Sequence, residues 1–269
     1  MNEETKLISV GELFRQSWSI YRERFQVILG IFAVPIILVA LGTILSEANI
    51  NKTAGDIISF IGGIIYFFAE LAFIYQLRDQ AGANDSYRNA FRNILPYIWL
   101  TILPGLIILG RFVMFIVPGI IFMIWLLFPL YVFVFENQRW MNAVLRSKEY
   151  IQGNWWQVFG RILALFVAIL IIYYLPVALT SDSVVISNGI AGLLELIFVP
   201  VSIIYFYLMY QSSKQMKTEL AGQPPTGPRG FFYFSAIMGI VGIVLLVLVA
   251  TYLSSAITEG LPNTSGLPE

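Results

Sequence analysis

The sequence predicts an all-α membrane protein, a polytopic helical bundle with three repeats of a cytoplasmic amphipathic helix plus a transmembrane hairpin, and an extra seventh span. Three observations support this fold class. Hydrophobic residues make up 58% of the chain and charged residues only 12%, whereas soluble domains carry about 25% charged residues. Seven stretches provide the roughly 20 apolar residues that a helix needs to cross a bilayer. One amphipathic pattern also recurs at an offset of 130 residues.

The recurring pattern is a surface helix that runs directly into a span. In the first copy, at about residues 9–24, the apolar stripe consists of Val10, Leu13, Phe14, Ser17, Ile20 and Tyr21. In the second clear copy, at about residues 138–154, it consists of Trp140, Ala143, Val144, Ser147, Tyr150 and Ile151. Steps of three and four residues place each set on one side of a helix. Such helices are expected to lie on a membrane surface.

A fainter copy of the surface helix lies between these two, at about residues 85–94. It contains Tyr87, Ala90 and Phe91 and is cut short by Pro96. At the helix starts, Ser9 and Glu12 form a capping box in the first copy, and the polar run 84–86 offers N-caps for the fainter one.

Seven spans follow from the apolar stretches. We predict them at about residues 26–46, 57–77, 95–111, 118–135, 156–178, 188–211 and 231–255. The third and fourth are separated at Pro118 and Gly119, a dipeptide typical of turns. The predicted organisation is a six-span domain at 1–215, a Pro/Gly linker at 216–230, the seventh span, and a disordered tail at 256–269.

Basic residues predict the orientation. Thirteen of the 16 Lys and Arg residues lie in segments 1–24, 78–93, 136–155 and 212–230, whereas the intervening segments carry only Lys52, Arg111 and Arg161. By the positive-inside rule, the N-terminus and the three surface helices face the cytoplasm and the C-terminus lies outside. We expect a multi-pass protein of a bacterial or archaeal cell membrane.

The composition also argues against several functions. The chain contains no Cys and no His, so zinc sites built on those residues, Ser-His-Asp and Cys-His nucleophiles and dithiol redox centres are excluded. A formal net charge of zero argues against binding to nucleic acid. We expect no enzyme activity and predict no catalytic residue, no metal and no cofactor. The expected partners are the lipid bilayer and a membrane protein or second copy of the chain.

Residues between the fourth and fifth spans carry a family resemblance. They are Pro118-Gly119-Ile120-Ile121, Phe128-Pro129, Glu136, Ala143, Arg146-Ser147 and Asn154-Trp155-Trp156-Gln157-Val158-Phe159-Gly160. Over about residues 5–215 the chain resembles the membrane domain of bacterial glycerophosphoryl diester phosphodiesterases and the related YciC-like six-span membrane proteins. The resemblance implies a membrane domain with no established biochemical activity. In those phosphodiesterases a separate soluble barrel carries the catalytic histidines, and this chain has neither.

Four ionisable residues inside or beside the spans are candidates for a polar site, because charges within a bilayer are costly: Glu70, Arg161, Glu195 and Arg111. At 1.5 Å per residue, Glu70 and Arg161 lie at a similar depth, roughly 10 Å from the cytoplasmic boundary. They are able to form an ion pair, which either lines a polar cavity or is structural. Glu195 and Arg111 either form a pair or are exposed at the membrane interface. Glu136 is expected to cap or anchor the third surface helix.

Aromatic and small residues have structural interpretations. Trp18, Trp140, Trp155 and Trp156 are predicted interfacial anchors of an aromatic belt. Ser235, Gly239 and Gly242 give the seventh span a small-residue face, which suits packing onto the six-span body or homodimerisation.

Two functions therefore compete. The first is a non-catalytic membrane module that organises lipids or partner proteins through its surface helices, whose apolar stripes and basic flanks suit an anionic leaflet. The alternative is a transporter or channel for a small solute, indicated by repeated hairpins and buried charges.

Overall fold

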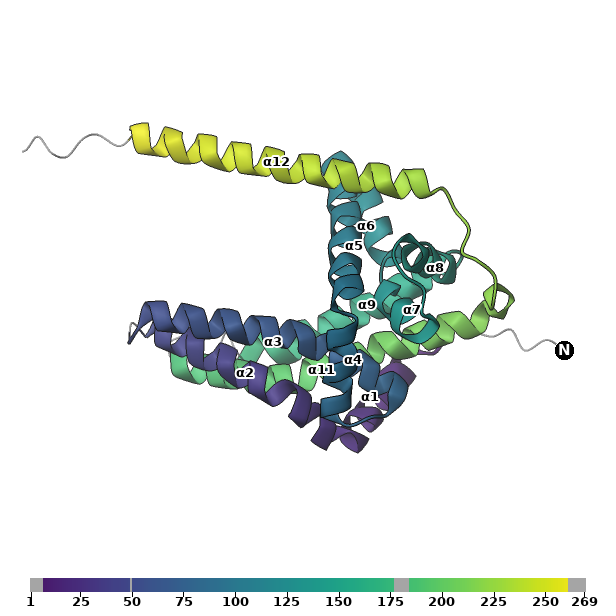
Figure 1. Ribbon diagram of the computed structural model, residues 1–269, viewed down its shortest axis with the longest axis horizontal. Coiled ribbons are helices and arrows are strands. Elements are labelled where there is room, and N and C mark those ends of the chain that lie inside the picture. Colours follow the sequence, from purple (N-terminus) through teal and green to yellow (C-terminus); the bar gives the residue numbers. More distant parts are fainter. Residues whose placement is uncertain (1–6, 49, 177–183, 261–269) are drawn as a thin grey trace, which may run out of the picture. The chain divides into compact units, whose positions relative to one another are not determined.

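A computed structural model describes residues 7–48, 50–176 and 184–260, and every regular element in these ranges is helical (Figure 1). The chain divides into two compact units. Unit 1 comprises Met1–Leu100 and Ile124–Thr226, and unit 2 comprises Thr101–Met123 and Gly227–Glu269. The predicted all-α class is confirmed.

The helices follow one another in the predicted order. They are α1 (Val10–Glu23), α2 (Phe25–Glu47), α3 (Lys52–Asp79), α4 (Ala83–Arg92), α5 (Ile94–Met114), α6 (Ile116–Trp125), α7 (Pro129–Glu136), α8 (Met141–Ile151), α9 (Trp155–Ile169), the π-helical turn η1 (Leu170–Tyr174), α11 (Val184–Met216), the 3₁₀ turn η2 (Thr218–Leu220) and α12 (Arg229–Gly260). The short helices α1, α4 and α8 each precede a pair of long helical segments. This alternation matches the three predicted repeats.

The starts of the surface helices differ in how closely they follow the prediction. The Ser9 hydroxyl accepts a hydrogen bond from the Glu12 backbone N–H, as the capping box requires. In the second helix the N-cap is Gly82, ahead of the predicted run 84–86, and the Ser86 hydroxyl donates to the Gly82 carbonyl. The third helix begins at Met141 instead of 138, because Trp140 has a φ of 57° and interrupts the helix.

Helices α2 and α3 run side by side as a hairpin in unit 1 (Figure 1). Their approach depends on Gly42 and Gly55. A Cβ atom on Gly42 would lie 2.6 Å from the Gly55 carbonyl oxygen, which is closer than real contacts allow. At the tip, the Asn51 side chain accepts from the Ala54 N–H and caps α3. Small residues thus let the two backbones touch.

The predicted fourth span is two helices, because Pro129 lacks a backbone N–H and begins a new one. The break leaves polar backbone groups that a buried side chain satisfies. The Ser147 hydroxyl donates to the Trp125 carbonyl at 2.7 Å and accepts from the Phe128 N–H at 3.0 Å. Helix α8, most of whose residues are buried within the protein, is thereby fixed to the middle of the span that precedes it.

The fifth and sixth spans both differ from the prediction. Helix α9 passes into the π-helical turn η1 at Leu170, so the predicted span 156–178 is not a uniform α-helix. Its predicted end falls at residues 177–183, outside the described ranges. Helix α11 is longer than predicted and continues to Met216.

In unit 2, the second part of α5 packs closely against α12. A Cβ atom on Gly110 would overlap the carbonyl oxygen of Ser235, and one on Gly239 would overlap the carbonyl oxygen of Leu106. The predicted small-residue face of the seventh span therefore packs against α5. Helix α12 extends to Gly260, five residues past the predicted end at 255, and the rest of the predicted tail, 261–269, lies outside the described residues.

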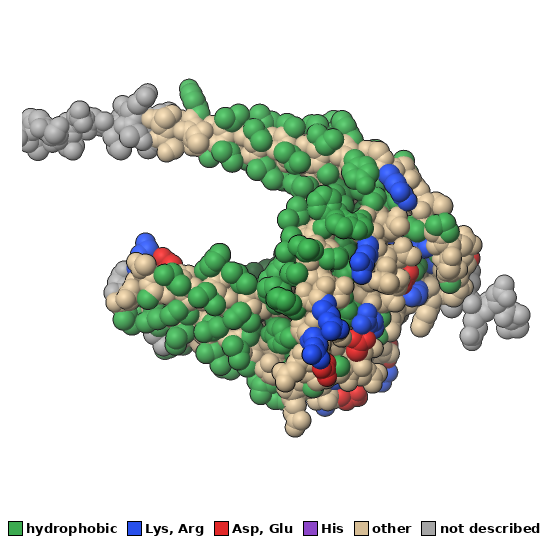
Figure 2. Space-filling model, in the orientation of Figure 1, with side chains coloured by type: hydrophobic (Ala, Val, Ile, Leu, Met, Phe, Trp, Pro, Cys, Tyr) green, Lys and Arg blue, Asp and Glu red, His purple; other side chains and the backbone are tan. Residues whose placement is uncertain are grey.

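Seven helical segments within the described residues are long and apolar enough to cross a membrane: Phe25–Glu47, Lys52–Asp79, Ile94–Met114, Ile116–Glu136, Trp155–Tyr174, Gly189–Met216 and Arg229–Ser255. Figure 2 shows hydrophobic side chains over α2 and α3 and along α12, and charged side chains gathered in unit 1 over α4 and α1. The protein is a multi-pass membrane protein.

Candidate functional site

Arg161, one of the four ionisable residues that the sequence singled out, binds backbone oxygens. Its guanidinium donates to the carbonyls of Ile8 at 2.7 Å and Leu7 at 2.9 Å, and to that of Gln157 at 2.7 Å. All three of its nitrogen atoms therefore have an acceptor. The side chain fastens the segment before α1 to helix α9, which is a structural task.

Glu70 does not share this arrangement. Its carboxylate is hydrogen-bonded to the Tyr97 side chain, at the start of α5. The ion pair with Arg161 does not form, since each side chain has its own partners. Similar depth in the bilayer did not bring the two together.

The other two predicted charges also have local partners. Glu195 on α11 accepts a hydrogen bond from the Tyr173 hydroxyl at 3.1 Å, within unit 1. Arg111 lies within unit 2, where its guanidinium carbon is 3.8 Å from the ring centroid of Phe231 and 4.6 Å from that of Phe122. Such cation–π contacts stabilise a cation that water does not reach.

The predicted interfacial tryptophans lie at surfaces. Trp18, Trp140 and Trp156 are exposed, and Trp155 is partly exposed and stacks on Phe159 with ring centroids 5.2 Å apart. Exposed indoles near the ends of apolar helices suit the headgroup region of a bilayer.

A groove that the sequence did not single out lies where surface helix α4 meets α3. Its lining residues are Ile65, Phe68, Asn84, Tyr87, Arg88, Phe91 and Arg92. The cavity volume is about 580 Å³, within the range of roughly 300–1,000 Å³ that small-molecule sites occupy. We call this the α3–α4 groove.

Helix α4 forms the groove because its apolar side chains recur at helical spacing. Tyr87 and Phe91 are four residues apart and lie on one face. The Phe91 ring stacks on Phe68 of α3, with centroids 6.2 Å apart and planes inclined by 23°. The Tyr87 hydroxyl donates to the Ile31 carbonyl at 2.7 Å, and burial raises the pKa of this phenol, so it stays protonated and keeps donating.

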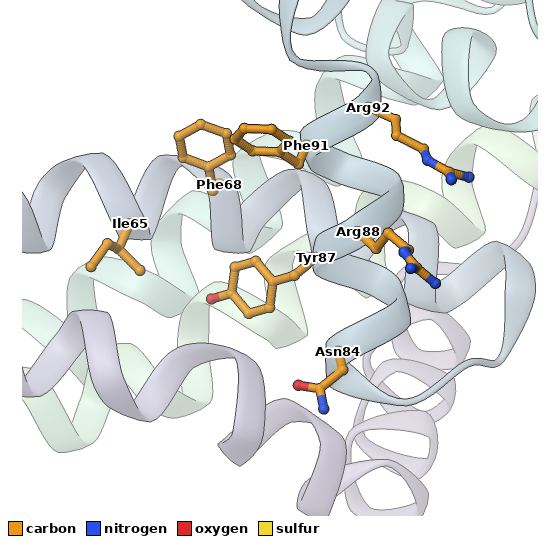
Figure 3. A pocket seen from close by; sticks show the side chains of 7 residues that line it. All are labelled: Ile65, Phe68, Asn84, Tyr87, Arg88, Phe91 and Arg92. Atoms are coloured by element: carbon orange, nitrogen blue, oxygen red, sulfur yellow. The ribbon is translucent and has the colours of Figure 1, made fainter.

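The apolar surface of the groove includes one exposed aromatic ring. The Phe91 side chain is 70% exposed despite its contact with Phe68. Figure 3 shows the rings of Phe68, Tyr87 and Phe91 on one side of α4 and the guanidinium groups of Arg88 and Arg92 on the other. The apolar trough and the cationic edge therefore lie on opposite sides of α4.

The two arginines are suited to a phosphate at the membrane surface. Arg88 and Arg92 are exposed, and their stems line the groove while the charged heads extend away from it. This is the behaviour of side chains that cover apolar surface and keep their charge in water. Asp79 lies nearby, but Arg78 and Asn89 already bind its carboxylate.

Comparison of the chain with protein-family models, curated proteins and solved structures found no match. The family resemblance stays a prediction, and the groove is interpreted from its own chemistry.

Proposed function

We propose that the protein is a non-catalytic membrane module that binds and organises anionic phospholipids, with the α3–α4 groove as its lipid site. The observation that carries the proposal is the apolar trough of Phe68 and Phe91, with the arginine pair across α4 from it. An acyl chain occupies the trough and the lipid phosphate binds Arg88 and Arg92. Membrane lipids combine these two chemistries in one molecule.

The energetics favour an anionic over a neutral lipid. A Lys or Arg near an anionic membrane surface contributes about 1 kcal/mol, so the arginine pair contributes about 2 kcal/mol. That corresponds to roughly a thirtyfold preference. Burial of acyl methylenes adds about 0.8 kcal/mol each, and this part does not depend on the headgroup.

The proposal includes an orientation. The excess of basic residues in the segments that hold α1, α4 and α8 favours the cytoplasmic leaflet for all three surface helices. We propose a bacterial or archaeal cell membrane, with the N-terminus in the cytoplasm and the C-terminus outside. The anionic lipids of the inner leaflet then face the groove.

The structure offers less support for a transporter. Arg161, Glu70 and Glu195 each have a partner in the protein, so these charges act as links between helices. A translocation pathway instead needs polar groups that exchange partners with a solute.

Native mass spectrometry of the protein released from nanodiscs of mixed phosphatidylglycerol and phosphatidylcholine tests the proposal. We expect wild type to retain phosphatidylglycerol, and the Arg88→Gln/Arg92→Gln variant to lose roughly 30-fold in its preference for it. The matched control is Arg15→Gln/Arg22→Gln, which removes the same charge from surface helix α1. Equal retention by the groove variant and the control would overturn the lipid site.

A further inference from the structure

A second cavity in unit 1 is organised around Glu136, at the end of α7. One oxygen of this carboxylate accepts hydrogen bonds from the hydroxyls of Tyr150 at 2.7 Å and Tyr210 at 2.6 Å. The ammonium of Lys214 lies 3.4 Å from the same oxygen. Burial and the bond to Glu136 raise the pKa of Tyr150, so its hydroxyl remains a donor. Helices α7, α8 and α11 are thereby joined at one carboxylate.

Arg146 on α8 also lines the cavity. Its side chain is only 2% exposed and is paired with Glu149 at 2.9 Å. The guanidinium also donates to the Gln223 carbonyl, and Glu149 accepts from the N–H and hydroxyl of Thr226 at 2.7 and 2.9 Å. These bonds hold the 223–226 segment over the site.

One donor of Arg146 is unused. Its Nε atom is buried and has no hydrogen-bond partner among the described residues. A buried guanidinium N–H without an acceptor costs about 1–3 kcal/mol or more. Arg146 also lines the cavity, so an acceptor on a bound molecule would offset this cost.

The cavity is large enough for such a molecule. It has a volume of about 500 Å³, and Gln138 and Asn142 add amide groups to its lining. A second pocket of about 370 Å³ adjoins it, since both are lined by Phe135, Tyr150, Lys214 and Ala221. The second pocket adds Lys217. We call this pair of adjoining pockets the Arg146–Lys217 cavity.

The charges of this cavity are predominantly positive. Arg146, Lys214 and Lys217 line it, against the single carboxylate of Glu136. The Glu149 carboxylate is paired with Arg146. When Glu149 is included, three positive charges face two negative charges, which leaves an excess of one positive charge. The donors come from α8, from α11 and from the residue after α11. A tetrahedral oxyanion accepts hydrogen bonds from several directions at once, whereas a planar carboxylate is restricted to its own plane.

We propose that the Arg146–Lys217 cavity binds a phosphate group, carried by a small phosphorylated molecule or by a lipid headgroup. Arg146 Nε donates to one phosphate oxygen, and Lys214 and Lys217 neutralise the remaining charge. This site is separate from the α3–α4 groove and does not depend on the lipid function proposed for that groove.

Binding of inorganic phosphate to the full-length protein in detergent provides the first arm of the test. Thermal unfolding is followed in sodium phosphate and in sodium chloride of equal ionic strength. We expect phosphate to raise the Tm of wild type and the Lys217→Gln variant to bind at least tenfold more weakly. Lys52→Gln, which removes a lysine at the start of α3, is the control and is expected to match wild type. Lys217 has no structural ion pair in the described residues, so its replacement leaves the fold intact.

The second arm distinguishes the two sources of phosphate. Native mass spectrometry from nanodiscs with phosphatidic acid measures lipid retention by Lys217→Gln and by Arg88→Gln/Arg92→Gln. If only the Lys217→Gln variant loses phosphatidic acid, and inorganic phosphate does not shift the Tm of wild type, the site binds a lipid headgroup. A Tm shift that needs Lys217 assigns it to a free phosphorylated molecule. If neither signal depends on Lys217, the phosphate site is refuted, whatever the result for the arginine pair.

Discussion

Phe68 of α3 and Phe91 of α4 stack with their ring centroids 6.2 Å apart. One ring belongs to a membrane span and the other to a surface helix, so the pair fixes α4 against the span at the point where the groove opens. Because Phe91 remains 70% exposed, the stack leaves room for an acyl chain.

Filling the groove is expected to displace lipid without unfolding the protein. Ile65 lines the trough, and Ile65→Trp places an indole where the acyl chain would lie. We expect native mass spectrometry to show less bound phosphatidylglycerol at an unchanged Tm. Ile37→Trp, at a 60% exposed position on α2, is the control and should retain lipid. Full retention in Ile65→Trp would speak against the trough as the acyl site.

Arg161 and Glu70 are expected to act independently. Arg161→Leu leaves the carbonyls of Leu7 and Ile8 without their donor, and we expect a loss of about 1–3 kcal/mol in the free energy of unfolding. A double-mutant cycle with Glu70→Gln should give an interaction energy below about 0.5 kcal/mol, since separate sites are additive. Reversible unfolding in mixed micelles measures this interaction energy. A coupling above about 1 kcal/mol would show that the two charges do interact.

Close packing of α5 and α12 predicts a sharp difference between two glycines. Gly239→Ala drives a methyl group into the Leu106 carbonyl, which is expected to cost about 1–3 kcal/mol as overpacking. Gly105→Ala on α5 meets nothing within 4 Å and should be neutral or stabilise by about 0.5–1 kcal/mol through helix propensity. Thermal unfolding compares the two. Equal Tm values would contradict the packing of unit 2.

The proposed orientation is testable because the chain contains no native cysteine. Single cysteines at the exposed positions Thr53 and Gln152 report on opposite ends of the spans. In intact cells, a membrane-impermeant maleimide should label Thr53→Cys and leave Gln152→Cys unlabelled until the cells are opened. The reverse pattern would invert the topology.

Local patterns predicted the elements of the fold well. The surface helices α1, α4 and α8 follow from apolar residues at steps of three and four, and this spacing needs no knowledge of tertiary structure. Their exact starts were less predictable. Trp140 adopts a positive φ, a conformation that its residue type does not indicate.

Contacts between distant segments were not predictable in the same way. The rise of 1.5 Å per residue puts Glu70 and Arg161 at the same depth, but it does not give the rotation of each helix about its axis. It also gives no sign of the Leu7 and Ile8 carbonyls that Arg161 binds. The groove was missed for a related reason. The spacing of four residues between Arg88 and Arg92, next to Tyr87 and Phe91, is a signal that the sequence does contain. The contribution of Phe68 required the fold.

The most direct test of the lipid site is photo-crosslinking. A phosphatidylglycerol with a diazirine in its acyl chain is incorporated into the membrane, activated by light, and mapped by peptide mass spectrometry. We expect labelling to concentrate on the groove residues of α3 and α4, around Ile65, Phe68 and Phe91, and to fall in the Arg88→Gln/Arg92→Gln variant. Labelling spread evenly over the exposed faces of α2, α9 and α12, with no change in that variant, would contradict it.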